Sequence, residues 1–385
     1  MMNIAVTVFW LSAALVVYVY FGYPLLLFLV KSLTGGRTVR HSDELPPVTL
    51  VISAFNEEGV IEKKIQNSLA LDYPRELLQI LVVSDASTDR TDDIVRAFAD
   101  DGVNLLRMSE RGGKTLGLNA AVEASNGEVV VFSDANAMYK GDSIRMLVRN
   151  FTDTEVGAVV GESTYVDPSS QAEQSESAYW RYETAIKAAE SSLGSTVGGD
   201  GAIYAIRKDL YRPMSADALS DFVNPCQIVE QGYRCLYEPS AVSIEEASGS
   251  FEKEYRRKVR IVNRAWRATM TMTQLLNPLR FGFFAIQFIS HKLLRWLVPL
   301  ILIVVITSNA YLLHSGLFYV MAFWAQVAFY ILAFVGKVVS GIRELPTWVA
   351  IPYYFCLVNI ASAQGILESY LGKTYATWST ARTGA

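Results

Sequence analysis

A short apolar run, Val129 to Phe132, constrains the fold of this chain more than any other feature. Four residues are too few for a helix and three of them are β-branched, so the run predicts a strand buried on both faces of a mostly parallel sheet. The next residues, Ser133-Asp134-Ala135-Asn136, place a carboxylate at the carboxyl end of that strand. Open α/β sheets bind ligands at this edge, and oxygen donors there suit a divalent cation shared with phosphate. A polar turn or helix cap is the alternative interpretation.

Three similar units precede this strand. The pattern predicts strands at Val48 to Ser53, Leu78 to Val83 and Val103 to Arg107, each followed by a helix. Such alternation with short connections predicts a parallel, right-handed β/α domain. Polar side chains follow the successive strands: Asn56, Glu57, Asp85, Lys114 and Asp134. Each alone is also an ordinary helix cap or solvated charge. Together they indicate a pocket with acids for a sugar-base moiety and a metal, and a lysine for phosphate.

Four segments together resemble the donor half of family 2 glycosyltransferases: Ala54-Phe-Asn-Glu-Glu58, Ser84-Asp-Ala-Ser-Thr-Asp-Arg-Thr91, Gly113-Lys114 with Leu118-Asn119, and Ser133-Asp-Ala-Asn136. That family consists of inverting enzymes with the GT-A fold that use nucleotide sugars. The resemblance extends roughly from residue 45 to residue 270. It implies that Asn56, Glu57 and Asp85 hold the nucleoside and that Lys114 contacts the nucleotide. It also implies that Asp134 binds Mg²⁺ or Mn²⁺ on the diphosphate. The family's Asp-x-Asp is Asp134-Ala-Asn136 here, so Asn136 is an uncharged second ligand.

The second half of the domain resembles the family's acceptor side. Another strand is expected at Val156 to Gly161, and a polar helix follows from Gln171 to Ser191. The segment from Gly198 to Arg207 resembles the glycine-rich acceptor loop that ends in an arginine. The resemblance implies acceptor-binding roles for Gly199, Asp200, Gly201 and Arg207. A tight turn before a strand is the alternative.

A general base is expected at the start of the following helix. Inverting transfer needs a carboxylate that removes the proton of the acceptor hydroxyl. Family members have an acidic pair here whose second member is the base, and this chain has Ser220-Asp221. The resemblance therefore assigns the base to Asp221. Helix capping by Asp221 and Asp217 is the alternative.

A basic helix is expected from Tyr255 to Arg267, where cellulose and hyaluronan synthases have Gln-x-x-Arg-Trp. Only Arg260 matches that motif, since Arg257 stands at the Gln and Ile261 at the Trp. The helix residues expected to contact the leaving diphosphate and the acceptor are Arg257, Arg260, Arg264 and Trp266. A basic helix resting on anionic headgroups is equally consistent with the pattern, and both interpretations can hold together.

Apolar segments at both ends predict membrane helices. Residues Ile4 to Val30 are almost wholly apolar, and about 20 such residues span a bilayer. Lys31, Arg37 and Arg40 follow, so the positive-inside rule places the next domain in the cytoplasm. Further apolar stretches follow the catalytic domain: an interfacial helix at 277–296, spans at 297–313 and 317–335, and a stretch at 348–367 that is a span, a re-entrant helix or a packed helix. The lone His291 in the interfacial segment is expected to contact headgroups or pack against another helix.

The predicted organisation has five parts: an N-terminal anchor (1–31), a GT-A domain (45–250), amphipathic helices (251–296), transmembrane helices (297–371) and a tail (372–385). If the tail gates the nucleotide site it is cytoplasmic, and the 348–367 stretch is then not a simple crossing. The net charge of −4 gives no reason to expect nucleic-acid binding. Three cysteines without metal-ligand spacing indicate reduced core residues.

The sequence thus predicts a multi-pass protein of the inner (plasma) membrane with a cytoplasmic α/β GT-A domain. The expected activity is metal-dependent, inverting transfer of a sugar from a nucleotide sugar, expected to be a UDP-sugar, to a growing polysaccharide or lipid-linked glycan. Its expected partners are that donor, the glycan or lipid-linked acceptor and membrane lipids. One alternative is a non-processive transferase that adds one sugar to a lipid carrier. The other is a membrane protein that binds a nucleotide sugar without turning it over.

Membrane topology is directly testable. If residues Lys31 to Trp296 are cytoplasmic, a thiol reagent added outside intact cells will not label Cys226. Labelling from outside would reverse the orientation and exclude cytosolic nucleotide sugars as donors.

Overall fold

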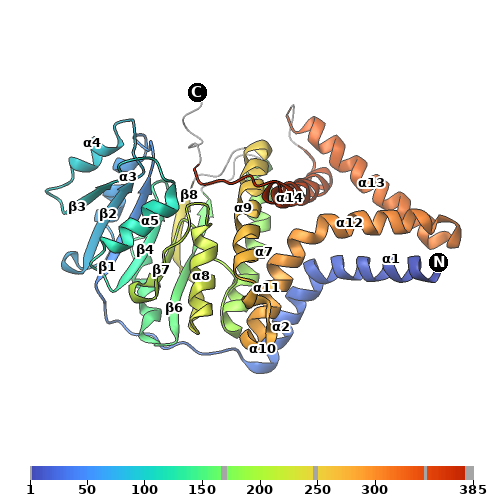
Figure 1. Ribbon diagram of the computed structural model, residues 1–385, viewed down its shortest axis with the longest axis horizontal. Coiled ribbons are helices and arrows are strands. Elements are labelled where there is room, and N and C mark those ends of the chain that lie inside the picture. Colours follow the sequence, from blue (N-terminus) through green and yellow to red (C-terminus); the bar gives the residue numbers. More distant parts are fainter. Residues whose placement is uncertain (1, 166–170, 246–249, 342–344, 378–385) are drawn as a thin grey trace.

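A computed structural model describes residues 2–165, 171–245, 250–341 and 345–377. A mixed sheet with helices on both faces forms one side of the molecule, and long helices extend from it on the other side (Figure 1). The strand order in the sheet is β3-β2-β1-β4-β7-β6-β8-β5. The bounds are β1 Val48–Ala54, β2 Leu78–Ser84, β3 Val103–Arg107, β4 Val129–Asp134, β5 Met138–Tyr139, β6 Val156–Tyr165, β7 Tyr204–Arg207 and β8 Arg234–Glu245.

The four predicted strands of the first half are confirmed. Strands β3, β2, β1 and β4 are parallel neighbours, whereas β7 runs antiparallel to both β4 and β6. The sheet therefore changes direction immediately beside its central strand. The strand expected at 156–161 extends to Tyr165, and β5 and β8 were not predicted.

Strand β4 is buried on both faces, as its apolar run predicts. Val130 and Phe132 belong to the core beneath α5 (Lys114–Glu123) and α8 (Ser220–Glu230). Val129 and Val131 belong to the opposite core, beneath α3 (Ile61–Leu69) and α6 (Ser143–Val148). The remaining helices of this half are α4 Thr91–Arg96, α7 Gln171–Leu193 and α9 Phe251–Thr271. The central strand is thus held rigidly, and so is the turn that follows it.

Within the described residues, four helices are long and apolar enough to cross a membrane: Met2–Thr34, Phe283–Tyr311, Leu317–Val339 and Thr347–Tyr370. The first consists of α1 (Met2–Val17), a π-helical turn (Tyr18–Gly22) and α2 (Tyr23–Thr34). The second consists of α11 (Phe283–Phe288), a π-helical turn (Ile289–Leu293) and α12 (Leu294–Tyr311), and the short α10 (Pro278–Phe281) precedes it. The third is α13 (Leu317–Val339) and the fourth α14 (Thr347–Tyr370). Most of the segment expected to be a separate interfacial helix is therefore part of a long continuous one.

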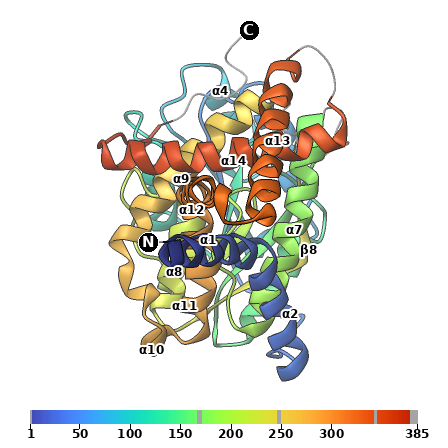
Figure 2. The ribbon, with the colours of Figure 1, turned by 90° about the vertical axis from the view of Figure 1, so that its right-hand side faces the viewer.

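Helix α14 lies across the other long helices. Helix α12 runs across the view in Figure 1 and points toward the viewer in Figure 2. Helix α14 is seen end-on in Figure 1 and runs across the view in Figure 2. In the most apolar part of α14, 56% of the residues are buried inside the protein. Helix α14 packs closely on α9, because a side chain at Gly365 would collide with the carbonyl of Val259. Of the interpretations of this stretch, the packed helix fits this arrangement best.

The described part of the C-terminal tail returns to the sheet domain. The Asn263 side chain donates to the carbonyl of Lys373 (3.2 Å), and the Tyr375 hydroxyl donates to Glu368 (2.5 Å). The carbonyl of Ala376 lies so close to Gly113 that a side chain there would collide with it. The described part of the tail therefore lies on the loop that begins α5.

The three cysteines are free, and Cys226 and Cys235 are fully buried. A thiol reagent will therefore not reach Cys226 in the folded protein from either side of a membrane, so labelling at this residue does not report topology.

Engineered cysteines at exposed positions provide a sharper test. Lys63 on α3 and His314 between α12 and α13 are both exposed. We expect an impermeant thiol reagent to label His314→Cys in intact cells, and Lys63→Cys only after permeabilisation. Wild-type protein, which has its own three cysteines, is the control for background labelling. The reverse pattern would place the sheet domain outside the cell.

Candidate functional site

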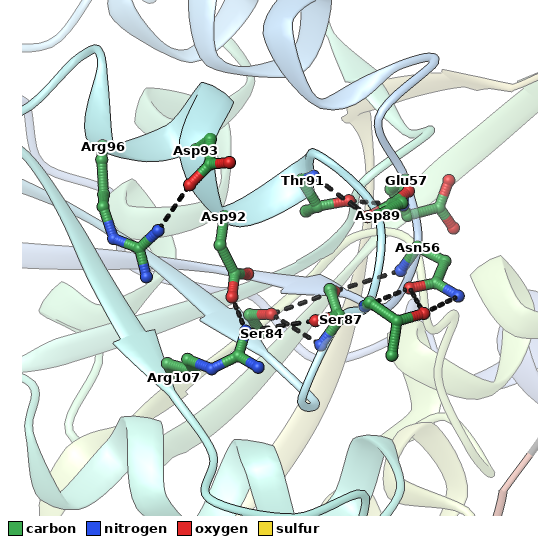
Figure 3. Close-up of polar contacts among 11 residues, drawn as sticks. Asn56, Glu57, Ser84, Ser87, Asp89, Thr91, Asp92, Asp93, Arg96 and Arg107 are labelled. Carbon is green, nitrogen blue, oxygen red and sulfur yellow. Dashed lines mark hydrogen bonds and ion pairs between the residues drawn. The ribbon is translucent and has the colours of Figure 1, made fainter.

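The loops after β1 and β2 are joined by hydrogen bonds at the carboxyl edge of the sheet (Figure 3). The Asn56 side-chain carbonyl accepts from the Thr88 amide (2.8 Å), and the Asn56 amide donates to the Ser87 hydroxyl (3.1 Å). The Glu57 amide donates to the hydroxyl of Thr91 (2.8 Å). Asn56 has a left-handed backbone (φ 53°), a conformation that asparagine tolerates better than most residues. These contacts hold the loop after β1, which includes Glu57, against the loop after β2.

Asp85 holds the glycine-rich loop that begins α5. One carboxylate oxygen accepts from the Gly112 amide (2.8 Å), and the other accepts from the Gly113 amide (2.9 Å). Gly113 has φ 89°, which a side chain would make costly. Asp85 is buried and positions the loop that delivers Lys114.

One cavity of about 490 Å³ contains most of the predicted site residues. Those that line it are Glu57, Lys114, Asp134, Asn136, Gly199, Asp200, Gly201, Asp221, Arg257, Arg260 and Arg264. Of the predicted residues, Asn56, Asp85, Arg207 and Trp266 do not line it.

Lys114 joins the two halves of this site. Its ammonium group forms an ion pair with Asp134 and donates to the carbonyl of Gly201 (3.3 Å). The Asp221 carboxylate lies beside the same point, since its Oδ2 is 3.5 Å from the Cβ position of a side chain at Gly201. The Gly199 amide donates to the Asp221 carbonyl (2.6 Å). The glycine-rich loop Gly198–Gly201 therefore packs directly against the start of α8.

Asp221 has the electrostatic environment of a proton acceptor. Burial raises its pKa above the ordinary value of 3.8, while Lys114 opposes this and Asp200 adds to it. A carboxylate with a raised pKa accepts a proton more readily in a reaction near neutral pH. Asp217, the neighbouring acid, instead forms an ion pair with Arg267 (2.9 Å).

A fully buried lysine supports the turn that holds Asp134 and Asn136. The Lys64 ammonium donates to the carbonyl of Ala137 and lies 4.0 Å from the centre of the Tyr139 ring. The Tyr139 hydroxyl donates to the carbonyls of Phe132 (2.9 Å) and Ala202 (3.0 Å). Burial lowers the pKa of Lys64 to about 7. These contacts tie the turn to α3 and to the start of β7.

Glu245, at the end of β8, was missed in the sequence analysis. It lines the cavity near Asp200 and Asp134, and burial together with those two charges raises its pKa to about 8. Its Oε1 is buried and has no hydrogen-bond partner within the described ranges. Burial and the two neighbouring carboxylates therefore favour the protonated form of Glu245. Only the unpredicted strand β8 brings it to the site, so the local sequence contains no signal for it.

The basic face of α9 lines the cavity. Arg260 is partly buried, and burial lowers its pKa while Arg257 lowers it further and Asp134 and Asp221 raise it. Arg264 clamps the loop before α8 by donating to the carbonyls of Asp217 (3.1 Å) and Ala218. The predicted arginines Arg257, Arg260 and Arg264 therefore line the cavity.

Trp266 lies outside the cavity. It packs edge-on against Trp296 and Tyr370, which joins α9 to α12 and α14. Its position is that of a packing residue between the catalytic domain and the long helices.

The acceptor-binding role predicted for Arg207 requires correction. Strand β7 runs antiparallel to β4, and Arg207 pairs with Val129 at the beginning of that strand. Its guanidinium donates to the carbonyls of Val156 (2.8 Å), Asp153 (3.2 Å) and Phe151. Arg207 therefore holds the loop before β6, at the opposite end of the sheet from Asp134.

The cavity has a second arm, toward the long helices, that no sequence motif indicated. Its lining residues are Tyr20, Trp180, Glu183, Lys187, His291, Lys292, Arg295, Trp296, Val358, Asn359 and Ser362. His291 packs between two helices and contacts Glu183 (3.0 Å) and Glu190 (2.8 Å), so of its two expected roles the structure shows helix packing.

Comparisons with known proteins agree with this architecture. Residues 49–212 match the model of glycosyl transferase family 2. A probable glycosyltransferase, YdaM of Bacillus subtilis, is 38% identical over 125 residues, which are 31% of this chain and 30% of that protein. The β-monoglucosyldiacylglycerol synthase of Nostoc sp. is 35% identical over 119 residues, 30% of this chain and 25% of that protein. The N-acetylglucosaminyltransferase of Rhizobium meliloti is 25% identical over 290 residues, 71% of this chain and 67% of that protein. The match thus spans a quarter to a third of the first two relatives.

Among solved structures, the mannosyltransferase PcManGT from Pyrobaculum calidifontis has a TM-score of 0.71 at 24% identity, covering 95% of this chain and 99% of that one. The likeness extends over the long helices as well as the sheet domain. Together with the family match, it establishes the GT-A fold.

The protonation of Glu245 predicts a pH-dependent stability. Its folded pKa, about 8, exceeds the ordinary 4.5, so the folded protein keeps a proton that the unfolded chain loses. The free energy of unfolding therefore falls as pH rises from about 4.5 to about 8. We expect Glu245→Gln to raise the melting temperature relative to wild type more at pH 8.5 than at pH 5. The exposed Glu123→Gln on α5 is the control. An equal difference at both pH values would contradict this assignment.

Proposed function

We propose, on the premise that residues 49–212 form a family 2 glycosyltransferase domain, that the chain is a membrane-bound inverting glycosyltransferase. It moves a sugar from a nucleotide sugar to an acceptor oxygen at the membrane. One observation carries the proposal: Asp134 and Asp221, far apart in the sequence, face one cavity and the same ammonium group, that of Lys114. A carboxylate for a metal–diphosphate and a carboxylate for a hydroxyl proton are the two groups that this reaction needs.

The donor end fits a divalent cation. Asp134 and Asn136 both line the cavity and offer oxygen ligands. In the described part of the chain no group of three His, Cys, Asp or Glu side chains could hold a metal. A site with one protein carboxylate suits Mg²⁺ or Mn²⁺, because such ions are commonly held by one or two carboxylates plus substrate phosphates. The cation would neutralise charge on the diphosphate as it leaves.

The acceptor end uses Asp221. The acceptor hydroxyl transfers its proton to the Asp221 carboxylate while its oxygen attacks the anomeric carbon on the face opposite the leaving group. The bond between that carbon and the diphosphate oxygen breaks, so the configuration inverts and the nucleoside diphosphate departs. Lys114 and Arg260, which both line the cavity, would stabilise the departing negative charge.

The donor is proposed to be a UDP-sugar, with the catalytic domain in the cytoplasm of a plasma-membrane protein. The mannosyltransferase of similar fold is in complex with GDP-Man and Mn²⁺, so a donor panel should include guanosine as well as uridine nucleotides. Relatives include both a glucosyldiacylglycerol synthase and a poly-β-1,6-N-acetyl-D-glucosamine synthase. Single transfer is favoured by Arg257 and Ile261, which depart from the polymerase motif, and product length separates the two activities.

Replacement of Asp221 tests the proposed base. Asp221→Asn keeps the shape but cannot take the proton, so we expect turnover to fall by about 10²–10⁴-fold. Donor affinity should change by less than about tenfold, because the base acts in the transition state. The exposed Asp209→Asn is a matched control with unchanged turnover. Near-normal turnover of Asp221→Asn would refute its assignment as the base. Helix capping would not explain such a result, because Leu219 is the N-cap residue of α8 and makes no side-chain cap hydrogen bond.

Removal of the metal tests the donor end. We expect excess EDTA to abolish nucleoside diphosphate release, and Mg²⁺ or Mn²⁺ to restore it. Asp134→Asn should lower turnover by about tenfold or more and weaken metal-dependent donor binding, because several kcal/mol of leaving-group stabilisation depend on the ion. Full activity in EDTA would refute metal dependence and leave leaving-group stabilisation to Lys114 and the arginines.

A further inference from the structure

A buried cluster of charges lies between α7 and the π-helical turn that leads into α12. His291 is fully buried and contacts Glu183 (3.0 Å) and Glu190 (2.8 Å) through its two ring nitrogens. Arg295 forms an ion pair with the other oxygen of Glu183. The Tyr23 hydroxyl donates to Glu190, whose second oxygen accepts from the Val197 amide (3.1 Å). All four carboxylate oxygens of Glu183 and Glu190 therefore have partners.

Two lysines in this cluster form no direct ion pair with its carboxylates, although Glu183 and Glu190 lie close enough to act on Lys292 electrostatically. Lys187 is only 4% exposed, and its ammonium lies 4.6 Å from the centre of the Trp180 ring. Lys292 lies beside Gly198, with its Cε 3.9 Å from the Cβ position of a side chain there. Neither lysine has an ion pair or donates a hydrogen bond to any residue that the structure describes, and both line the cavity. In the described cluster three cations, Lys187, Lys292 and Arg295, face the two carboxylates Glu183 and Glu190. An excess of positive charge in a largely buried cluster is costly, so this arrangement calls for an anion.

The two lysines lie next to the proposed reaction centre. Gly198, which Lys292 approaches, precedes Gly199, and the Gly199 amide donates to the carbonyl of Asp221 (2.6 Å). An anion bound between Lys187 and Lys292 would therefore lie across the Gly198–Gly201 loop from Lys114 and Asp134, on the side proposed for the acceptor.

The surroundings of the lysines belong to the long apolar helices. Tyr20 comes from the first candidate span, Trp296 from the second, and Val358, Asn359 and Ser362 from α14. The two π-helical turns touch here through the hydroxyls of Tyr18 and Ser290 (2.8 Å). Such turns inside long helices often occur at functional sites. An anion that reaches this arm between membrane helices would arrive attached to an apolar chain.

We propose that Lys187 and Lys292 bind the phosphate group of a lipid acceptor whose separate hydroxyl is the reacting group, and that this contact sets the hydroxyl beside the Gly198–Gly201 loop and Asp221. This inference rests on the proposed glycosyl transfer and names its acceptor class. Lys187 and Lys292 act as phosphate ligands, and the Glu183–His291–Glu190 contacts hold the two helices that present them.

Direct binding tests this proposal separately from catalysis. The full-length protein in detergent is titrated with a polyprenyl monophosphate, with the corresponding polyprenol and with inorganic phosphate, and bound ligand is counted by native mass spectrometry. We expect the lipid phosphate to bind at least about tenfold more tightly than the alcohol, since charge-assisted hydrogen bonds are the strong ones. Lys187→Gln and Lys292→Gln should each remove about tenfold of the affinity for the phosphate form and leave the affinity for the alcohol unchanged. Lys187→Arg, which keeps the charge, should restore most of it.

The exposed Lys63→Gln is the matched control and should bind like wild type. Nucleotide-sugar binding is measured on the same variants and should not change, so loss of the lipid site and loss of donor binding are distinguishable. Equal binding of lipid phosphate and alcohol by wild type would overturn the proposal, even if the variants failed to fold. Inorganic phosphate that competes as well as the lipid phosphate would show a free-anion site and overturn the lipid assignment.

Discussion

The position of β4 between a parallel and an antiparallel neighbour determines the site. Its parallel partner β1 pairs Ser53 with Asp134, so the loops after β1 and β4 end at the same edge. Its antiparallel partner β7 pairs Tyr204 with Phe132, so the chain before β7 arrives at that edge as well. The Gly198–Gly201 loop and the start of α8 therefore lie opposite Asp134. The same pairing carries Arg207 to the other end of the sheet.

The resulting cavity holds acidic and basic side chains together, and burying either kind without the other would cost free energy. Asp134, Asp200, Asp221 and Glu245 line it together with Lys114 and the arginines of α9. Where an ammonium group is close, as for Asp134, the acid forms an ion pair. Where burial dominates, as for Asp221 and Glu245, the pKa rises. The cavity therefore holds one acid in an ion pair, Asp134, and two whose pKa is raised, Asp221 and Glu245.

Helix α9 connects this chemistry to the membrane side. One face lines the cavity through Arg257 and Arg260, and Trp266 and Asn263 contact α12, α14 and the tail. The cavity is continuous from the sheet edge to residues of three candidate membrane spans. A donor from the aqueous side and an acceptor from the membrane side could thus meet at Asp221. This geometry is consistent with an enzyme that works at a lipid surface.

The sequence by itself determined the strand-and-helix order of the first half, the apolar segments at both ends and the residue types of the donor edge, because these depend on local periodicity and on polar residues placed after buried strands. It also predicted that Lys114, Asp134 and Asp221 share a site, through resemblance to a family rather than through any local rule. Only the tertiary structure decided which way β7 runs, and hence that Arg207 lies away from the site. It likewise placed Glu245 in the cavity through β8, and turned the polar residues of α7 inward against His291 and Arg295. Strand direction and the pairing of buried charges depend on contacts between segments far apart in the chain, which no local pattern encodes.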